Sequence, residues 1–105
     1  MLRSVAVSTV QLRRYKITPG DMDAFVEWWH TLIPAREKYG FRVLFALVDE
    51  STNEFTWAVS HDGDFDEVEK TYNASPERAA VFAGVPNRVA EHFVSKVTVE
   101  HAAWD

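Results

Sequence analysis

Alternating hydrophobic and polar residues near the start of the chain predict a β-strand, and an amphipathic helix is expected to follow it. The strand spans roughly Thr9 to Ile17, and the turn Pro19-Gly20 ends it. Apolar residues then recur at the i, i+3, i+4 and i+7 positions of a helix, namely Met22, Phe25, Val26, Trp29, Leu32 and Ile33.

Three residues mark the expected limits of this helix. Asp21 can accept a hydrogen bond from the first turn as an N-cap residue. Pro34 lacks an N–H group, and it therefore predicts a kink or a restart of the helix. The helix is expected to end at Gly40, because glycine readily adopts the left-handed backbone that closes many helices.

The rest of the chain predicts three more strands and a second helical region, after a short arm over residues 1–8. The strands are expected at about Phe41 to Val48, Glu54 to Ser60 and Val94 to Ala102. Between the last two strands, Phe65, Val68 and Tyr72 share one face of a helix. Ser75-Pro76 is typical of the N-cap and first residue of a further helical piece, which is expected to run to about Phe82.

The predicted order of elements is β-α-β-β-α-β, which is that of the ferredoxin-like fold. Right-handed crossovers then predict a four-stranded antiparallel sheet in the order 4-1-3-2, with both helices on one face. The expected fold class is therefore α+β. A length of 105 residues is typical of one domain, so we expect residues 1–105 to form a single unit.

Alternation along the strands divides the sheet into two faces. The face expected under the helices is apolar and carries Phe41, Val43, Phe45, Leu47, Phe55, Trp57 and Val59, continued by Val97 and Val99. The opposite side, here called the open face, is mixed, but it brings together Leu12, Leu44, Ala46, Val48 and Ala58. A patch of this kind is typical of an interface. The alternative is a half-polar surface with scattered apolar residues.

Composition and charge narrow the classes of function. The absence of cysteine excludes disulfides, thiolate metal sites and cysteine nucleophiles. A net charge of -5 argues against nucleic acid as a partner, because phosphate binding requires clustered Lys and Arg. No apolar run is long enough to cross a membrane, and the first residues lack the apolar segment of a signal peptide. We therefore expect a cytoplasmic protein with no membrane partner.

Three segments resemble NIPSNAP-type domains, which are members of the dimeric α/β-barrel (ferredoxin-like) superfamily. They are Leu12-Arg13-x-Tyr15 with Pro19-Gly20, then Lys38-Tyr39-Gly40-Phe41, and Tyr72 with Ser75-Pro76-Glu77-Arg78. The resemblance covers about Val10 to His101. It implies a homodimer in which the sheets of two subunits close a barrel about a two-fold axis. The superfamily contains several kinds of enzyme and proteins with no assigned reaction, so the resemblance implies a fold more than an activity.

The resemblance also implies where a ligand would lie, because small molecules in this superfamily bind between the sheet and the helices of each subunit. Residues expected to reach that space are Arg13, Tyr15 and Trp57 from the strands and Trp29, His30 and Tyr72 from the helices, with Trp28 and His101 as further candidates. Tryptophan faces suit stacking on a flat ligand, so a small aromatic or apolar ligand is expected. Taken singly, Trp29 and Trp57 are first of all expected to be large residues of the core.

One histidine is the leading candidate for proton transfer. His61 follows the third strand and precedes Asp62, whose carboxylate could hold the imidazole in one tautomer. The four histidines do not have the spacing of metal ligands, so no metal site is expected. The second helical region has no histidine that could ligate haem, and the chain has no Gly-rich phosphate loop. No cofactor is expected.

These observations leave three functions open. The first is a homodimeric protein of unassigned activity that binds a small apolar or aromatic metabolite. The second is a cofactor-independent monooxygenase or isomerase acting on such a molecule, in which Trp57 and Tyr15 shape the pocket and His61 moves protons. The third is a non-catalytic dimerisation scaffold. A cavity lined by Arg13, Tyr15 and His61 would favour the enzyme, and a space filled by Trp and Phe would favour the scaffold.

Overall fold

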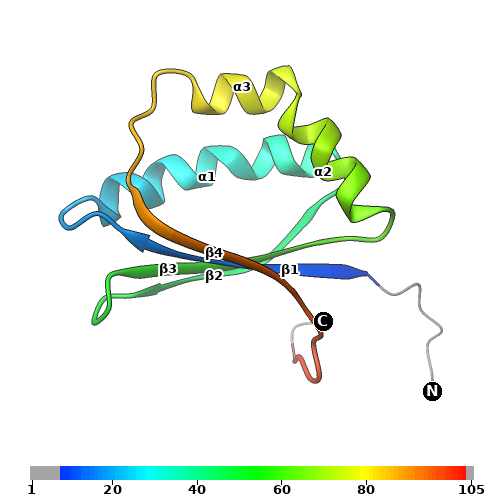
Figure 1. The fold of residues 1–105 in the computed structure, drawn as a ribbon, viewed down its shortest axis with the longest axis horizontal. Coiled ribbons are helices and arrows are strands. Elements are labelled where there is room, and N and C mark those ends of the chain that lie inside the picture. Colours follow the sequence, from blue (N-terminus) through cyan, green and yellow to red (C-terminus); the bar gives the residue numbers. More distant parts are fainter. Residues whose placement is uncertain (1–7, 104–105) are drawn as a thin grey trace.

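The computed structural model describes residues 8–103 as a four-stranded antiparallel sheet with three helices on one side (Figure 1). The strands are β1 (Thr9–Ile17), β2 (Arg42–Asp49), β3 (Glu54–His61) and β4 (Val89–Val97), and the helices are α1 (Met22–Lys38), α2 (Phe65–Asn73) and α3 (Pro76–Phe82). The sheet order β2-β3-β1-β4 is the predicted one, so the α+β ferredoxin-like fold is confirmed. Residues 1–7 of the expected arm lie outside the described part. None of the helices over residues 8–103 is long and apolar enough to span a membrane.

Helix α1 ends at the predicted place. Gly40 has a φ of +86° and closes a Schellman motif, in which its N–H donates to Glu37 O and the N–H of Phe41 donates to Arg36 O. The prediction for its start was wrong in one respect, because the Asp21 side chain makes no capping hydrogen bond within residues 8–103. The helix also runs through Pro34 without a restart.

The second helical region forms in two pieces, as predicted. At the start of α2 the Asp64 carboxylate accepts a hydrogen bond from Glu67 N–H, and at the start of α3 the Ser75 hydroxyl accepts one from Arg78 N–H. Pro76 occupies the first turn of α3, where its missing N–H costs nothing. Both helices lie on the same side of the sheet as α1 (Figure 1).

A bulge interrupts the alternation in β2. Val43 pairs with Val59, whereas Phe45 pairs with Ala58, so Leu44 is an extra residue in this strand. Partners in an antiparallel pair share a side of the sheet, and one extra residue therefore exchanges the two sides for the remainder of the strand.

The predicted sides of four β2 residues were consequently wrong. Ala46 and Val48 pair with buried residues of β3 and lie on the helix side, while Phe45 and Leu47 lie on the open face. The physical reason is that strict alternation fails wherever one strand has a residue that its partner lacks.

The predicted position and orientation of the last strand were also wrong. β4 begins at Val89 and ends at Val97, so Val99 lies beyond it. Val97 pairs with Val10 on the open face, and Lys96 pairs with Gln11 on the helix side, where its Nζ donates to the carboxylate of α2 residue Asp66. β4 is an edge strand that is exposed along most of its length, so its sequence lacks the apolar alternation of a half-buried strand.

The core lies between the helices and the upper side of the sheet in Figure 1. The Trp29 ring packs edge-to-face on Phe55 and Trp57, with centroids 5.0 and 5.4 Å apart. The other buried apolar residues of this core are Ile17, Phe25, Leu32, Ala35, Phe41, Val59, Phe65 and Tyr72.

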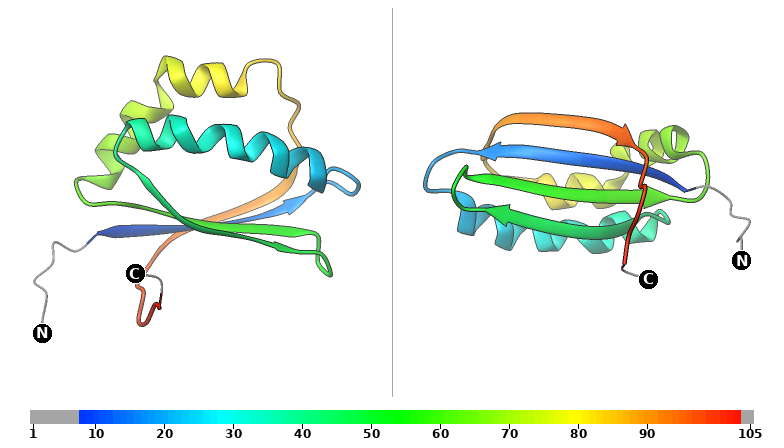
Figure 2. Two further views of the ribbon diagram at one scale, coloured as in Figure 1. Left: turned by 180° about the vertical axis from the view of Figure 1, so that it is seen from behind. Right: turned by 90° about the horizontal axis from the view of Figure 1, so that it is seen from below.

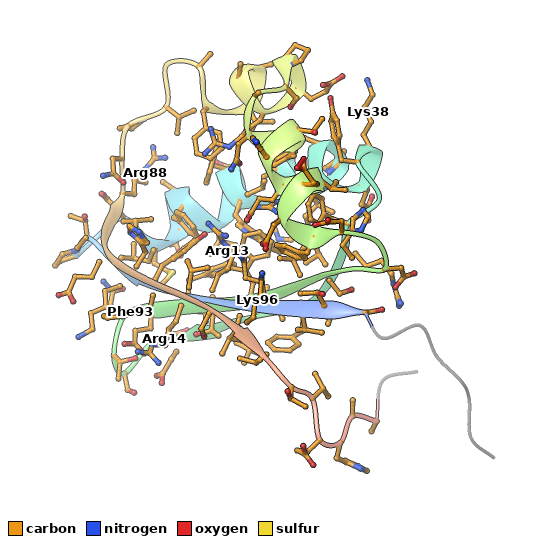
Figure 3. All side chains as sticks on the ribbon, turned by 45° about the vertical axis from the view of Figure 1, so that its right-hand side comes forward. Arg13, Arg14, Lys38, Arg88, Phe93 and Lys96 are labelled. Carbon is orange, nitrogen blue, oxygen red and sulfur yellow. The ribbon has the colours of Figure 1, made fainter. Side chains whose placement is uncertain are left out.

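The open face is left uncovered by the helices of the described chain (Figure 2). Its apolar residues, as assigned by the strand pairing, are Val10, Leu12, Phe45, Leu47, Ala58, Phe93 and Val97. Figure 3 shows Arg14 and Phe93 together on this side, with the guanidinium 4.7 Å from the ring centroid. The open face is therefore more apolar than alternation alone predicts.

Candidate functional site: a pocket between the sheet and the helices

A pocket of about 420 Å³ lies between strands β1, β3 and β4 and the three helices, a size typical of small-molecule sites. The sheet contributes Gln11, Arg13, Tyr15, Trp57, Val89, His92 and Val94. The helices contribute Phe25, Trp28, Leu32, Arg36, Glu69, Tyr72, Asn73, Arg78 and Phe82. In Figure 3 Arg13 is visible in the layer between sheet and helices, opposite in direction to its neighbour Arg14.

Two arginines and one carboxylate meet at one end of this pocket. Glu69 Oε2 lies 3.6 Å from NH1 of Arg13 and 3.7 Å from NH2 of Arg36. Arg13 has further partners, because its Nε donates to Tyr15 Oη at 2.7 Å and its NH1 donates to Gln11 Oε1 at 2.6 Å. These two hydrogen bonds hold the Arg13 guanidinium in the pocket wall.

Arg36 has far fewer hydrogen-bond partners than Arg13 among the described residues. Its side chain is 5% exposed, and its Nε and NH1 have no hydrogen-bond partner among residues 8–103. The rings of Phe41, Trp57 and Tyr72 surround the guanidinium, with centroids 4.9, 5.5 and 4.5 Å from Cζ. These rings favour a cation but accept no ordinary hydrogen bond. Burial, and then the charge of Arg13, lower the pKa of Arg36.

Two further donors are buried beside Arg36. Trp57 Nε1 and the Tyr72 hydroxyl have no hydrogen-bond partner within the described chain. Burial raises the pKa of Tyr72, with the charge of Arg36 acting in the opposite direction, so its hydroxyl stays protonated at neutral pH. The polar end of the pocket thus combines one net positive charge, from Arg13, Arg36 and Glu69, with unused donors.

The other end of the pocket is aromatic. Phe25, Trp28, Phe82 and Val89 line it and also line a neighbouring pocket of about 220 Å³ against the loop before β4. Trp28 is held there by a hydrogen bond from its Nε1 to Val81 O at 2.9 Å and by the Phe82 ring, 5.0 Å away between centroids. The pocket therefore has distinct polar and apolar ends.

The predicted ligand residues divide into two groups. Arg13, Tyr15, Trp57 and Tyr72 line the pocket, as does the further candidate Trp28. Trp29 is a core residue, and His30 is exposed with its ring against that of Trp29. The lining, as formed by residues 8–103, does not include Trp29 or His30. Consecutive residues of a helix point about 100° apart. His30, two residues after Trp28, therefore cannot lie on the side of α1 from which Trp28 lines the pocket.

His61 lies at the end of β3, apart from the lining residues of the described chain. Its Nε2 donates to Tyr39 O at 3.0 Å, and its Nδ1 accepts from Gly63 N–H at 2.9 Å, because a carbonyl can only accept and an amide can only donate. The backbone holds this tautomer, whereas the neighbouring Asp62 accepts a hydrogen bond from Ser8. The histidine that lines the pocket is His92, on β4.

Arg36 and Glu69 were missed as site residues, although the sequence contained a signal for both. Arg36 stands at i+4 from Leu32 and i+7 from Trp29, so it continues the apolar stripe of α1. Glu69 stands at i+4 from Phe65 and three residues before Tyr72, on the buried side of α2. Charged residues on two apolar helix faces mark a polar site inside the fold.

Comparisons with known proteins bear on the fold. No family model matches this chain, and no curated protein matches it in sequence. Solved structures match closely in shape: a NIPSNAP domain protein from Burkholderia xenovorans has a TM-score of 0.77 at 16% identity, over 92% of this chain and 99% of its own. A NIPSNAP family protein from Agrobacterium tumefaciens has a TM-score of 0.75 at 11% identity, over 88% and 92%.

A third similar structure is that of a candidate antibiotic biosynthesis monooxygenase from Nitrosomonas europaea. It has a TM-score of 0.71 at 11% identity, over 95% of this chain and 97% of its own. Likeness at such low identity establishes architecture and leaves activity open. The chain thus has the ferredoxin-like α+β fold of NIPSNAP-domain proteins, as the resemblance of its sequence motifs predicted.

Proposed function

We propose that this protein binds a small molecule with an apolar or aromatic body in the pocket between the sheet and the helices. The observation that carries this proposal is a pocket of about 420 Å³ whose aromatic wall contains buried donors without partners in the described chain. A few polar groups set in an apolar wall are typical of ligand sites. Arg13, Tyr15, Trp57 and Tyr72 are the proposed contacts.

The pocket also favours ligand binding over the two alternatives. In a scaffold, Trp and Phe were expected to fill the space between the sheet and the helices. A pocket of about 420 Å³ in this space does not support that expectation. An enzyme was expected to bring Arg13, Tyr15 and His61 together, but among the described residues only the first two line the pocket. Binding without an assigned reaction is therefore the leading proposal.

Titration with N-phenyl-1-naphthylamine, a neutral fluorescent aromatic, tests this proposal. We expect a saturable rise in fluorescence that Trp57→Ala abolishes, because Trp57 forms part of the pocket wall. This substitution should also cost about 3–5 kcal/mol of stability, so circular dichroism must accompany the titration.

A second variant avoids this loss of core packing. Val94→Trp adds bulk to an exposed lining residue of β4 and should block the pocket in a stable protein. Absence of saturable binding in the parent protein, or unchanged binding in both variants, would contradict the proposal.

We further propose that the protein is a homodimer formed through the open face. Leu47 is 57% exposed and Phe93 is 43% exposed there, on the same side of the sheet as Val10, Leu12 and Val97. Exposed apolar residues gathered on one side of a sheet are typical of interfaces, and a two-fold axis would place the same surface on both sides of the contact. Light scattering at micromolar concentration is the direct test, and a parent monomer would rule the dimer out.

A further inference from the structure

We infer that the ligand of this pocket carries a carboxylate, which Arg36 binds at the polar end while the apolar body lies against the aromatic end. The inference rests on the proposed function and specifies the class of ligand, an aromatic or apolar monocarboxylate. It is carried by the arrangement of Arg13, Arg36 and Glu69 and by the donors around them.

The described residues do not balance the charge of Arg13 and Arg36 at the polar end of the pocket. Glu69 is the carboxylate shared by Arg13 and Arg36, and its distances of 3.6 and 3.7 Å are ion-pair distances longer than hydrogen bonds. A buried charge without a full partner is costly. One further negative charge at this position would neutralise the second arginine.

The unused hydrogen-bonding groups of Arg36 and Trp57 at this end are donors, and the Tyr72 hydroxyl can donate as well as accept. Arg36 and the Trp57 indole can only donate, and the protonated Tyr72 hydroxyl has no hydrogen-bond partner within residues 8–103. A ligand that satisfies them must therefore supply oxygen acceptors. A carboxylate supplies two acceptors and one negative charge in a plane that matches the guanidinium fork.

The length of the pocket suits a carboxylate attached to a ring system. Arg36 and Trp28 line the same pocket from one helix, eight residues apart, which corresponds to about 12 Å along the axis. The apolar end, at Phe25, Trp28 and Phe82, can therefore take the rings while the carboxylate reaches Arg36.

A matched pair of probes tests this inference in the whole protein. 2-Naphthoate and 2-naphthamide have the same ring system and nearly the same shape, but only the first is an anion at pH 7. Calorimetric titration should give a dissociation constant about 10- to 100-fold lower for the naphthoate. Arg36→Met should remove this preference, whereas Lys70→Met, which removes a charge from the exposed side of α2, should retain it.

A variant with the opposite effect guards against loss of folding. Glu69→Gln removes the carboxylate that competes for both arginines, so it should tighten naphthoate binding and leave naphthamide binding unchanged. Equal affinity of the two probes, or weaker naphthoate binding in Glu69→Gln, would overturn the inference while leaving the pocket proposal standing. Failure of naphthoate, naphthamide and N-phenyl-1-naphthylamine alike would instead overturn the proposed function.

Stability provides an independent readout. Arg36→Met replaces a poorly paired buried charge with a shorter apolar side chain, so the melting temperature without ligand should stay the same or rise. Naphthoate should raise the melting temperature of the parent protein more than that of this variant. If naphthoate raised the melting temperature of Arg36→Met as much as it raises that of the parent protein, the role given to Arg36 would be contradicted.

Discussion

Gly40 is the residue at which the backbone leaves α1 and enters β2. Its φ of +86° is in the left-handed region, and a Cβ built there would lie 2.9 Å from His61 Nε2. The His61 ring cannot easily move away, because its two nitrogens bond to the backbone at Tyr39 and Gly63. Conformation and space therefore both select glycine here.

Substitution of this glycine separates the two effects. Gly20→Ala is the reference, because Gly20 has the same φ and no described residue beyond its chain neighbours lies within 4 Å of a built Cβ, and it should cost about 1–2 kcal/mol. Gly40→Ala should cost roughly 1–3 kcal/mol more, since the His61 ring must shift. Urea unfolding measures both, and equal losses would show that the contact with His61 has no energetic effect.

At the scale of elements, one carboxylate ties α3 to the end of α1. Glu77, in the first turn of α3, accepts a hydrogen bond from Tyr39 Oη at 2.7 Å and another from Lys38 Nζ. The hydrogen bonds from Lys38 and then Tyr39 lower the pKa of Glu77 from 4.5 to about 2. The same contact raises the pKa of Lys38 and of Tyr39.

This contact predicts a dependence of stability on pH. Because the pKa of Glu77 is lower in the folded protein, the stabilisation is complete above pH 4.5 and is lost as the pH falls from 4.5 toward 2. Glu77→Gln should therefore flatten the fall in unfolding free energy over this window. Glu27→Gln, which changes an exposed carboxylate of α1 outside this contact, should not. If the unfolding free energy fell in parallel with pH in the parent protein and in both variants, the prediction would be contradicted.

At the scale of the whole molecule, the sheet separates two surfaces with different proposed uses. The pocket lies on the helix side, and the proposed dimer contact lies on the open face. The bulge at Leu44 decides which β2 residues belong to which side. A change on one surface should therefore leave the other intact.

Leu47 and Val48 provide a matched test of the dimer. The two residues are adjacent and similarly exposed, at 57% and 44%, but Leu47 is on the open face and Val48 on the helix side. Leu47→Glu should weaken the dimer by roughly 100-fold or more, because a charge would be buried without a partner. Val48→Glu should remain a dimer in light scattering. If both variants were monomers, this assignment of Leu47 and Val48 to opposite sides of the sheet would be contradicted.

The sequence by itself determined the order of the elements, the sheet order and the fold class. It also determined local features such as the Ser75-Pro76 start of α3 and the left-handed end of α1 at Gly40. These features could be predicted because they depend on the period of a helix or strand and on the backbone preferences of single residues. Alternation and helical spacing likewise direct Arg13, Tyr15, Trp57 and Tyr72 to the helix side, where they line the pocket.

Only the tertiary structure decided the sides of Phe45 to Val48, the start of β4, and the meeting of Arg13, Arg36 and Glu69. The bulge is a property of two paired strands, and an exposed edge strand is under little pressure to alternate. The charged cluster joins β1, α1 and α2, so its distances depend on how the helices pack on the sheet. Periodicity places a side chain on one side of its own element, whereas packing between elements brings these three charges together.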